Sequence, residues 1–355
     1  MNDRVNSRVN GGVNDGVNDH PNDSKEISGV LDTQPLRPVR EEHATRAWRP
    51  GRHRRPGPRR RRDVLIAVAA VALALVLAGH RLVPDVAGVG TVLDSGLPWL
   101  GALVPVLALV ALVGRARRSL LALTAPALVW VLMFGSAFAP GGAPPGPADL
   151  TVVTQNLYAR NPDPGRTLAE LAATGADLVA VQEMANRSAA EVLDEAYPHH
   201  VVVGTVGLWS RHPIRDHAPL DLGLGWPRAL RARVATPRGE VVVLVAHLGS
   251  ARPGATADRD RSLAHLTEAV AREDQRVLVL GDLNTASTDR RMADLTDTLR
   301  DAQREAGVGL GFTWPATFPV TRPDHVLFRG LTAVDAAVVR TSGSDHRAAT
   351  ARLRL

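Results

Sequence analysis

The sequence predicts a layered α/β domain over residues 150–355, preceded by three membrane-spanning helices over residues 63–139. Short runs of β-branched and other apolar residues recur throughout the C-terminal part, with few helical segments between them. This pattern favours two packed sheets with helices outside over one doubly wound sheet. Three long apolar runs come earlier, and a Pro/Gly-rich segment separates them from the domain.

The first 62 residues are predicted to be a disordered, Arg-rich cytoplasmic tail. A Val-Asn dipeptide recurs every four residues, and a Pro- and Arg-rich run with little apolar content follows. This tail holds 14 Arg/Lys and 8 Asp/Glu, whereas residues 148–355 hold 24 and 25. The basic pI therefore comes from the tail, and the net charge of −1 on the domain argues against a polyanion-binding surface. The chain has no cysteine, which excludes disulfides, thiolate catalysis and Cys-ligated zinc.

The three apolar runs each approach the roughly 20 residues that a helix needs to cross a bilayer. They are VLIAVAAVALALVLAGHRL from Val64, PWLGALVPVLALVALVG from Pro98 and SLLALTAPALVWVLMFG from Ser119. The alternative, buried helices of a soluble core, would require three successive helices that are apolar on every face. Membrane spans are the simpler interpretation.

Arginine placement predicts the orientation of these spans. Nine arginines lie between Arg46 and Arg62, and three more lie between the second and third runs, so both regions are expected in the cytoplasm. Three crossings then place the C-terminal domain on the extracytoplasmic side of the cell membrane. Residues 140–149 are predicted to be a Pro/Gly linker that keeps the domain near the bilayer.

Ten strands and four helices are expected in the domain. The strands are LTVVTQNL, DLVAVQE, HHVVVG, VGLWSR, ALRARVAT, EVVVLVAHL, RVLVLGD, DHVLFR, TAVDAAVVR and RAATARLRL, and the helices are 165–174, 187–196, 258–272 and 288–299. Polar residues stand where many of these strands begin or end, which is where catalytic groups are commonly held. They are Asn156, Glu183, His247, Asp282, Asn284, Asp324, Asp345 and His346.

The segment VLVLGDLNTA illustrates the pattern, because a buried strand runs directly into Asp282 and Asn284. Taken alone, Gly-Asp-Leu-Asn is also what an ordinary turn contains. The partners supplied by the other strand ends favour a site. Trp314 is assigned to the core, with a pocket wall as the alternative, and one of Arg228, Arg231 and Arg233 is expected to be able to reach a phosphate.

Carboxylate and amide oxygens without a thiol suit a hard cation. Mg²⁺ is the expected cofactor, with Mn²⁺ or Ca²⁺ as alternatives. Cleaving a phosphate ester requires charge stabilisation on the phosphoryl oxygens, a positioned water and proton transfer. The residue set therefore fits the requirements of metal-dependent hydrolysis of a phosphate ester.

The motifs TQN, VQE, AHL, GDLN, DHV and SDH, in this order, resemble the endonuclease/exonuclease/phosphatase superfamily, which has the DNase I fold. The resemblance implies a four-layer α/β sandwich. It implies that Asn156, Glu183 and Asp345 hold the metal, with Glu183 as the principal ligand. Asp282 and Asn284 would position water and phosphate. His346, oriented by Asp324, would contact phosphate or act as base, and His247 would protonate the leaving oxygen.

The three spans followed by such a domain also resemble the VanJ-like group, actinobacterial membrane proteins linked to teicoplanin resistance. This resemblance implies a phosphatase or phosphodiesterase of the cell envelope whose substrate is a lipid-linked phosphate or pyrophosphate, such as undecaprenyl pyrophosphate. Glycopeptide resistance would be its role, and the lipid bilayer its partner. The alternatives are an anchored extracellular nuclease, disfavoured by the domain's charge, and a non-catalytic sensor or interaction protein.

Overall fold

The computed structural model describes residues 57–139 and 146–355. Most of the predicted tail and of the predicted linker, residues 140–149, lies outside them. Helix α1 (Pro58–Gly79) begins five residues before position 63, where the membrane-spanning part was predicted to start. Proline at the first helical position has no N–H that needs a partner, and arginine is a good helix former, so the run PRRRR starts the helix.

Two helices are long and apolar enough to cross a membrane, Pro58–Leu82 and Ser119–Phe138. A third crossing exists only if α2 (Val89–Leu100) and α3 (Leu103–Val113) form one span, and a bend of 56° separates them. The predicted span that starts at Pro98 is therefore not confirmed as a third crossing. The remaining helices of this part are α4 (Ser119–Ala122) and α5 (Thr124–Phe134), with single 3-10 turns at His80–Leu82, Val86–Gly88 and Gly135–Phe138.

The break between α2 and α3 is stabilised by Trp130 of α5. Its indole Nε1 donates to the carbonyl of Pro98 at 2.8 Å and so satisfies an oxygen at the end of α2. The ring lies against Gly101, where a Cβ would come within 2.2 Å of Nε1. Only glycine permits this close approach.

The C-terminal domain contains two six-stranded sheets. One has the order β11-β12-β1-β2-β4-β3 and the other the order β5-β6-β7-β8-β10-β9. The strands of the first sheet are β1 (Leu150–Asn156), β2 (Leu178–Gln182), β3 (His199–Val203), β4 (Val206–Ser210), β11 (Thr332–Val339) and β12 (Ala348–Arg354). Those of the second are β5 (Ile214–Pro219), β6 (Ala229–Thr236), β7 (Gly239–His247), β8 (Val277–Asp282), β9 (Arg300–Asp301) and β10 (Asp324–Arg329).

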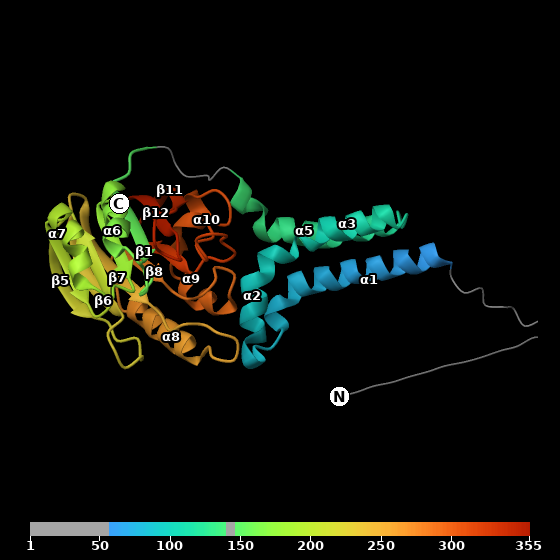
Figure 1. Cartoon of the computed structure of the whole chain (residues 1–355), viewed down its shortest axis with the longest axis horizontal. Helices are drawn as coiled ribbons and strands as arrows, with labels where there is room; N and C mark the ends of the chain where they lie inside the picture. Colours follow the sequence, from blue (N-terminus) through green and yellow to red (C-terminus); the bar gives the residue numbers. More distant parts are fainter. Residues whose placement is uncertain (1–56, 140–145) are drawn as a thin grey trace, which may run out of the picture. The chain divides into compact units, whose positions relative to one another are not determined.

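Alternating side chains of these strands build three apolar layers. Val152 and its counterparts on one face pack between the two sheets, whereas Val153 faces the helices α6 (Pro164–Ala173) and α7 (Glu191–Ala196). The second sheet packs its outer face against α8 (Ala257–Ala271) and α9 (Ala293–Thr296). The order helix, sheet, sheet, helix is the predicted α/β sandwich, and Figure 1 shows these elements in the domain.

Each sheet has one central parallel pair, β1 with β2 and β7 with β8. The flanking strands β12 and β10 run antiparallel to β1 and β8. The carboxyl ends of four strands and the amino ends of two others therefore meet at one edge of the sandwich. This edge is where the polar residues singled out from the sequence should gather.

All ten predicted strands are present, and two more were missed. β5 is an edge strand with five exposed residues out of six, so it lacks an apolar alternation, and β9 has only two residues. The helix predicted at 288–299 is shorter, because it consists of a 3-10 turn at Arg290–Met292 followed by α9. A short helix, α10 (Ala302–Ala306), was also missed.

Candidate functional site

Three of the predicted residues lie side by side on adjacent strands of the second sheet. Strand register pairs His247 of β7 with Asp282 of β8, and Asp282 with Asp324 of β10. Paired residues in a sheet project to the same face. His247 Nε2 lies 3.8 Å from Asp282 Oδ2, and all three side chains are at most 3% exposed.

The first sheet contributes Asn156, Glu183 and His346. Asn156 Nδ2, at the end of β1, donates to Asp282 Oδ2 at 2.8 Å, which bridges the two sheets. Asn156 Oδ1 accepts from the backbone N–H of Tyr158 at 2.8 Å. Both ends of this buried amide are therefore held by the protein, which fixes its orientation.

Glu183 follows β2 with a backbone φ of 56°, a left-handed conformation that is uncommon for a residue with a side chain. Oε2 accepts from the backbone N–H of Ala159 at 2.8 Å, and Oε1 lies 3.6 Å from His247 Nε2. Five non-glycine residues in the described parts have positive φ, and three of them, Tyr158, Glu183 and Asn284, are at this site. Backbone strain gathers where a side chain must be aimed.

His346 stands just before β12 and faces Asp324 across the gap between the sheets. Its Nδ1 lies 2.8 Å from Asp324 Oδ2, and Nε2 lies 3.9 Å from Asp282 Oδ2. Burial alone lowers the pKa of His346, but the carboxylates of Asp324 and Asp282 outweigh it and raise the pKa to about 10. The ring is therefore an imidazolium at neutral pH. Thr313 Oγ1 also donates to Asp324 Oδ2, at 2.5 Å, and the buried Oδ1 has no partner within the described residues.

His247 has the opposite charge state. Burial lowers its pKa to about 4, and Asp282 opposes this only in part. Arg228 Nη2 lies 2.7 Å from His247 Nδ1 and 2.5 Å from Nε2, a contact that a positively charged ring would repel. The site thus holds one charged and one neutral imidazole. The role of His247 as proton donor to the leaving oxygen stays a prediction.

The Gly-Asp-Leu-Asn segment forms the turn that presents Asp282. Asp282 Oδ1 accepts from the backbone N–H of Asn284 at 2.8 Å, and Asn284 Nδ2 donates to the carbonyl of Leu248 at 3.0 Å. Gly281 has a φ of 151°, and a Cβ there would lie 1.9 Å from the carbonyl oxygen of Ala246. Only glycine fits, because the neighbouring strand passes so closely.

Asp345 lines the same cleft as Asn284 and His346, and its Oδ2 accepts from Trp314 Nε1 at 3.4 Å. Trp314 is 40% exposed and lines this cleft, so its assignment to the core is wrong. The ligand atoms that approach one another within 4.8 Å belong to Asp282, Asp324 and His346, a different set from the one predicted to hold metal.

Several contributors were not predicted from the sequence. Thr313 supports Asp324, and three residues of α2, a helix taken for a connection and the start of a span, line the cleft. Among the three candidate arginines only Arg228 reaches the site. Arg231 binds Glu273, and Arg233 lies 3.8 Å from Glu240. A proline and an exposed tryptophan just before Arg228 interrupt the strand pattern there, which is the only signal that sets this arginine apart.

Solved structures share this architecture. Humanized D. rerio TDP2 with 14 mutations is 18% identical over 58% of this chain and 99% of its own, with a TM-score of 0.50. A mannosyl-6-phosphatase from Bacteroides thetaiotaomicron is 15% identical over 58% of this chain and 100% of its own, also with a TM-score of 0.50. These identities establish the fold alone.

No curated protein matches this chain. Residues 153–346, more than half of the chain, match the Endonuclease/Exonuclease/phosphatase family, and they run from β1 to the histidine that faces Asp324. The matched segment thus contains all eight residues that the sequence singled out. The chain belongs to the Endonuclease/Exonuclease/phosphatase family.

Proposed function

We propose that this chain is a membrane-anchored, metal-dependent phosphoesterase whose cleft opens on the extracytoplasmic side. The observation that carries the proposal is the convergence of Asn156, Glu183, His247, Asp282, Asp324 and His346, linked by contacts of 2.8–3.9 Å. These residues come from six separate segments of both sheets. Members of the family are phosphoesterases and nucleases that depend on a divalent metal.

The donor set fits a hard divalent cation, and we assign Mg²⁺ to Glu183, Asn156 and Asp345. Glu183 Oε2 is occupied by a backbone N–H, whereas Oε1 is left for a metal. A metal at Asn156 Oδ1 would share that oxygen with the Tyr158 N–H. Bound there, the ion would polarise the phosphoryl group and offset its negative charge.

The cluster of Asp282, Asp324 and His346 is the competing metal site. We favour a different role for it, because His346 and Asp324 are hydrogen bonded to each other and the imidazole is protonated at neutral pH. A protonated ring repels a cation and attracts a phosphate. In this assignment the Asp324 carboxylate orients the ring, and Nε2–H donates to a phosphoryl oxygen.

Asp282 is placed to position the attacking water. Its Oδ2 already accepts from Asn156 and lies within 4 Å of both imidazoles, so it is at the centre of the site. Asp282 accepts a hydrogen bond from the water and orients it toward phosphorus. The Asp282 carboxylate also takes the proton of the water, because both ring nitrogens of neutral His247 lie against Arg228 Nη2, which adds a positive charge beside them.

The substrate we propose is a lipid-linked phosphate or pyrophosphate of the cell envelope, of the undecaprenyl pyrophosphate type. The helices that could cross a membrane precede the domain closely in the chain, and the domain carries a net charge of −1. That charge supports a small anionic group held by local residues over a long polyanion. A contribution to glycopeptide resistance follows only from the likeness to the VanJ-like group.

The test is a release assay with the purified full-length protein in detergent and Mg²⁺. Undecaprenyl pyrophosphate, a phosphodiester lipid, a mononucleotide and DNA are compared, each with wild type and with Glu183→Gln. The proposal expects phosphate release from the polyprenyl substrate, lost with EDTA and in the variant. Rapid cleavage of DNA with no release from the lipid would identify an anchored nuclease. A Glu183→Gln protein with full biological activity would identify a non-catalytic role.

A further inference from the structure

One wall of the catalytic cleft comes from outside the α/β sandwich. The cleft has a volume of about 470 Å³ and is lined by Asn284, Asp345 and His346 together with Thr91, Val92 and Ser95 of α2. Residues at these spacings lie on one side of a helix. The same helix begins the bent pair of the apolar part of the chain.

α2 is fixed to the segment that follows the Asp282 turn. Asp94 is fully buried, and its Oδ2 accepts from Arg290 Nε at 2.7 Å and from the Arg290 backbone N–H at 3.0 Å. Thr288 Oγ1 donates to the Asp94 carbonyl, and Arg259 donates to Thr91 Oγ1 at 3.2 Å. Buried, paired charges hold two elements in one arrangement, so α2 is a fixed part of the cleft.

Exposed apolar and aromatic side chains lie on α2 and on the 312–318 loop, and two of them, Val92 and Trp314, line the cleft itself. Val92 is 54% exposed, Trp99 42% and Phe318 68%. Trp99 lies 5.8 Å from the Phe312 ring and 6.1 Å from the Phe318 ring, and its indole donates to the carbonyl of Val320 at 2.8 Å. Trp314 lines the cleft, and its ring centroid lies 6.5 Å from that of His346. Large apolar groups left exposed next to charged catalytic groups mark a place for an apolar ligand.

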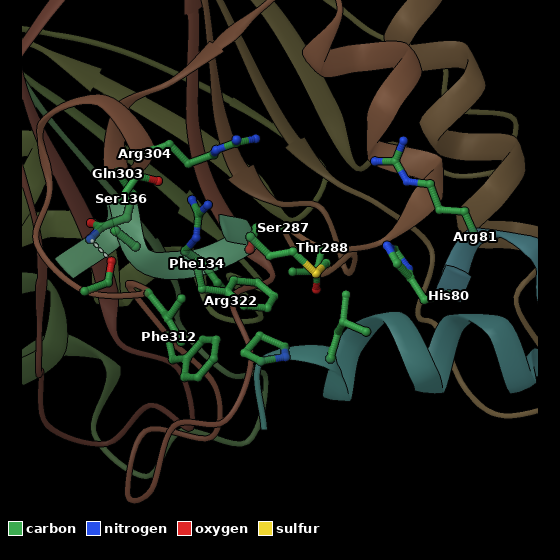
Figure 2. Close-up of a pocket in the computed structure, with 16 residues that line it drawn as sticks. His80, Arg81, Phe134, Ser136, Ser287, Thr288, Gln303, Arg304, Phe312 and Arg322 are labelled. Atoms are coloured by element: carbon green, nitrogen blue, oxygen red, sulfur yellow. Dashed lines mark hydrogen bonds between the residues drawn. The ribbon is translucent and has the colours of Figure 1, made fainter. Parts of the chain in front are cut away.

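A second hollow of about 230 Å³ lies along the same segments. Figure 2 shows Phe134 and Phe312 in it together with Thr288 and Arg322, and Leu97 and Pro98 of α2 also line it. The loops 284–288 and 312–323 line both hollows. The apolar part of this hollow includes Leu97, Pro98 and Phe312, and Arg81, Arg304 and Arg322 make another part of its lining charged.

We propose that α2 and the 312–318 loop form a hydrocarbon-binding wall, so that the preferred substrate is an amphiphile. Its phosphate lies at His346, and its chain runs past Val92 toward the Trp99, Phe312 and Phe318 rings. This inference rests on the proposed function and narrows it. A phosphate ester without an apolar chain would use the catalytic residues and leave the wall empty.

The test compares two pyrophosphates that share the reacting group and differ in chain length, farnesyl and dimethylallyl pyrophosphate. Full-length wild type, Val92→Ser and Val89→Ser are assayed in the same detergent with Mg²⁺. Val89 is the matched control, because it is on the same helix, is 57% exposed and does not line the cleft. The quantity measured is the ratio of kcat/KM for the two substrates.

Wild type is expected to prefer the farnesyl substrate, and Val92→Ser to lower that preference roughly tenfold, as loss of about two buried methyl groups predicts. Val89→Ser should match wild type. Equal kcat/KM for both substrates in wild type, or the same ratio in the two variants, overturns the wall. If wild type hydrolyses neither substrate, the proposed function fails instead. In that case the affinities of Val92→Ser and Val89→Ser for farnesyl pyrophosphate, measured by calorimetry, test the hydrocarbon-binding wall. Equal affinities would overturn it.

Discussion

Arg290 binds Asp94 through both its side chain and its backbone. The two residues are 196 positions apart, and Asp94 also holds His80 Nδ1 at 2.7 Å. A network of this kind connects the helical part of the chain to the loop that begins at the Asp282 turn. The contribution of this network to the free energy of unfolding can be measured directly.

Asp94→Asn should destabilise the protein by about 3–5 kcal/mol, because it leaves the Arg290 charge without its buried partner. Thermal unfolding in detergent, followed by circular dichroism, measures the effect. Glu268→Gln is the matched control, since the Arg272–Glu268 pair on α8 is exposed and should contribute under about 0.5 kcal/mol. Equal shifts for the two variants would show that the Asp94 network does not hold α2 in place.

Glu183→Gln should weaken Mg²⁺ binding by at least roughly a hundredfold, because it removes one of the two charged ligands assigned to the metal. Isothermal titration with Mg²⁺ gives the affinity without any substrate. Glu191→Gln, an exposed carboxylate in α7, is the control and should bind as wild type does. Normal binding by Glu183→Gln together with lost binding by Asp282→Asn would move the metal to the Asp282, Asp324 and His346 cluster.

Asp324→Asn should lower kcat by roughly 10²–10³-fold, the range for loss of a hydrogen-bond donor that stabilises charge in the transition state. The amide keeps the shape but no longer stabilises the charged form of His346. Steady-state kinetics on the substrate found in the release assay measures the loss. Asp335→Asn, an exposed residue of β11, should be neutral. An unchanged kcat in Asp324→Asn would remove His346 from the chemistry.

Arg228→Ala should raise KM for an anionic substrate roughly tenfold or more, because one charge-assisted contact to phosphate is lost. The guanidinium lies against the His247 ring and 4.8 Å from the centroid of Trp226. Arg233→Ala on the following strand is the control, with its weak 3.8 Å pair to Glu240. Equal KM values for the two variants would show that Arg228 only supports His247.

The buried Asp301–Arg322 pair predicts how stability changes with pH. Burial alone raises the pKa of Asp301, but Arg322 at 2.6 Å and His325 outweigh it and hold the pKa well below its usual range. A depressed folded pKa gives stability that is present above the unfolded pKa of about 4 and is lost as pH falls below it, by up to ~1.4 kcal/mol per unit.

Asp301→Asn removes this dependence. The stability difference between wild type and Asp301→Asn should therefore be largest near neutral pH and shrink below about pH 4. Unfolding midpoints from neutral pH to pH 3 measure it. A difference that stays constant over that interval would mean that Asp301 is not ionised in the folded protein.

The sandwich was predictable because its cause is local. Each central strand is a short apolar run, and each run ends in a polar residue that the parallel pairing brings to one edge, as for Asn156, His247 and Asp282. The missed edge strand β5 depends on pairing with β6 alone, since its own residues are mostly polar and exposed.

The role of α2 was not predictable in the same way. The apolar run from Pro98 reads as one span, and the bend arises from contacts made far along the chain, by Trp130 on Gly101 and by Arg290 on Asp94. The charge states of the two site histidines could not be predicted from the sequence for a similar reason. His247 and His346 look alike in sequence, and only their surroundings raise one pKa and lower the other.

The bonds Asn156–Asp282 and His346–Asp324 each join one sheet to the other. The candidate site therefore lies across the interface of the two sheets. The relative position of its residues depends on how the sheets pack on the apolar core between them. Substitutions in the core between the sheets, such as at Leu280 or Val152, are therefore expected to lower kcat while all strands remain folded. On heating, catalytic activity should likewise be lost at a lower temperature than the secondary structure followed by circular dichroism.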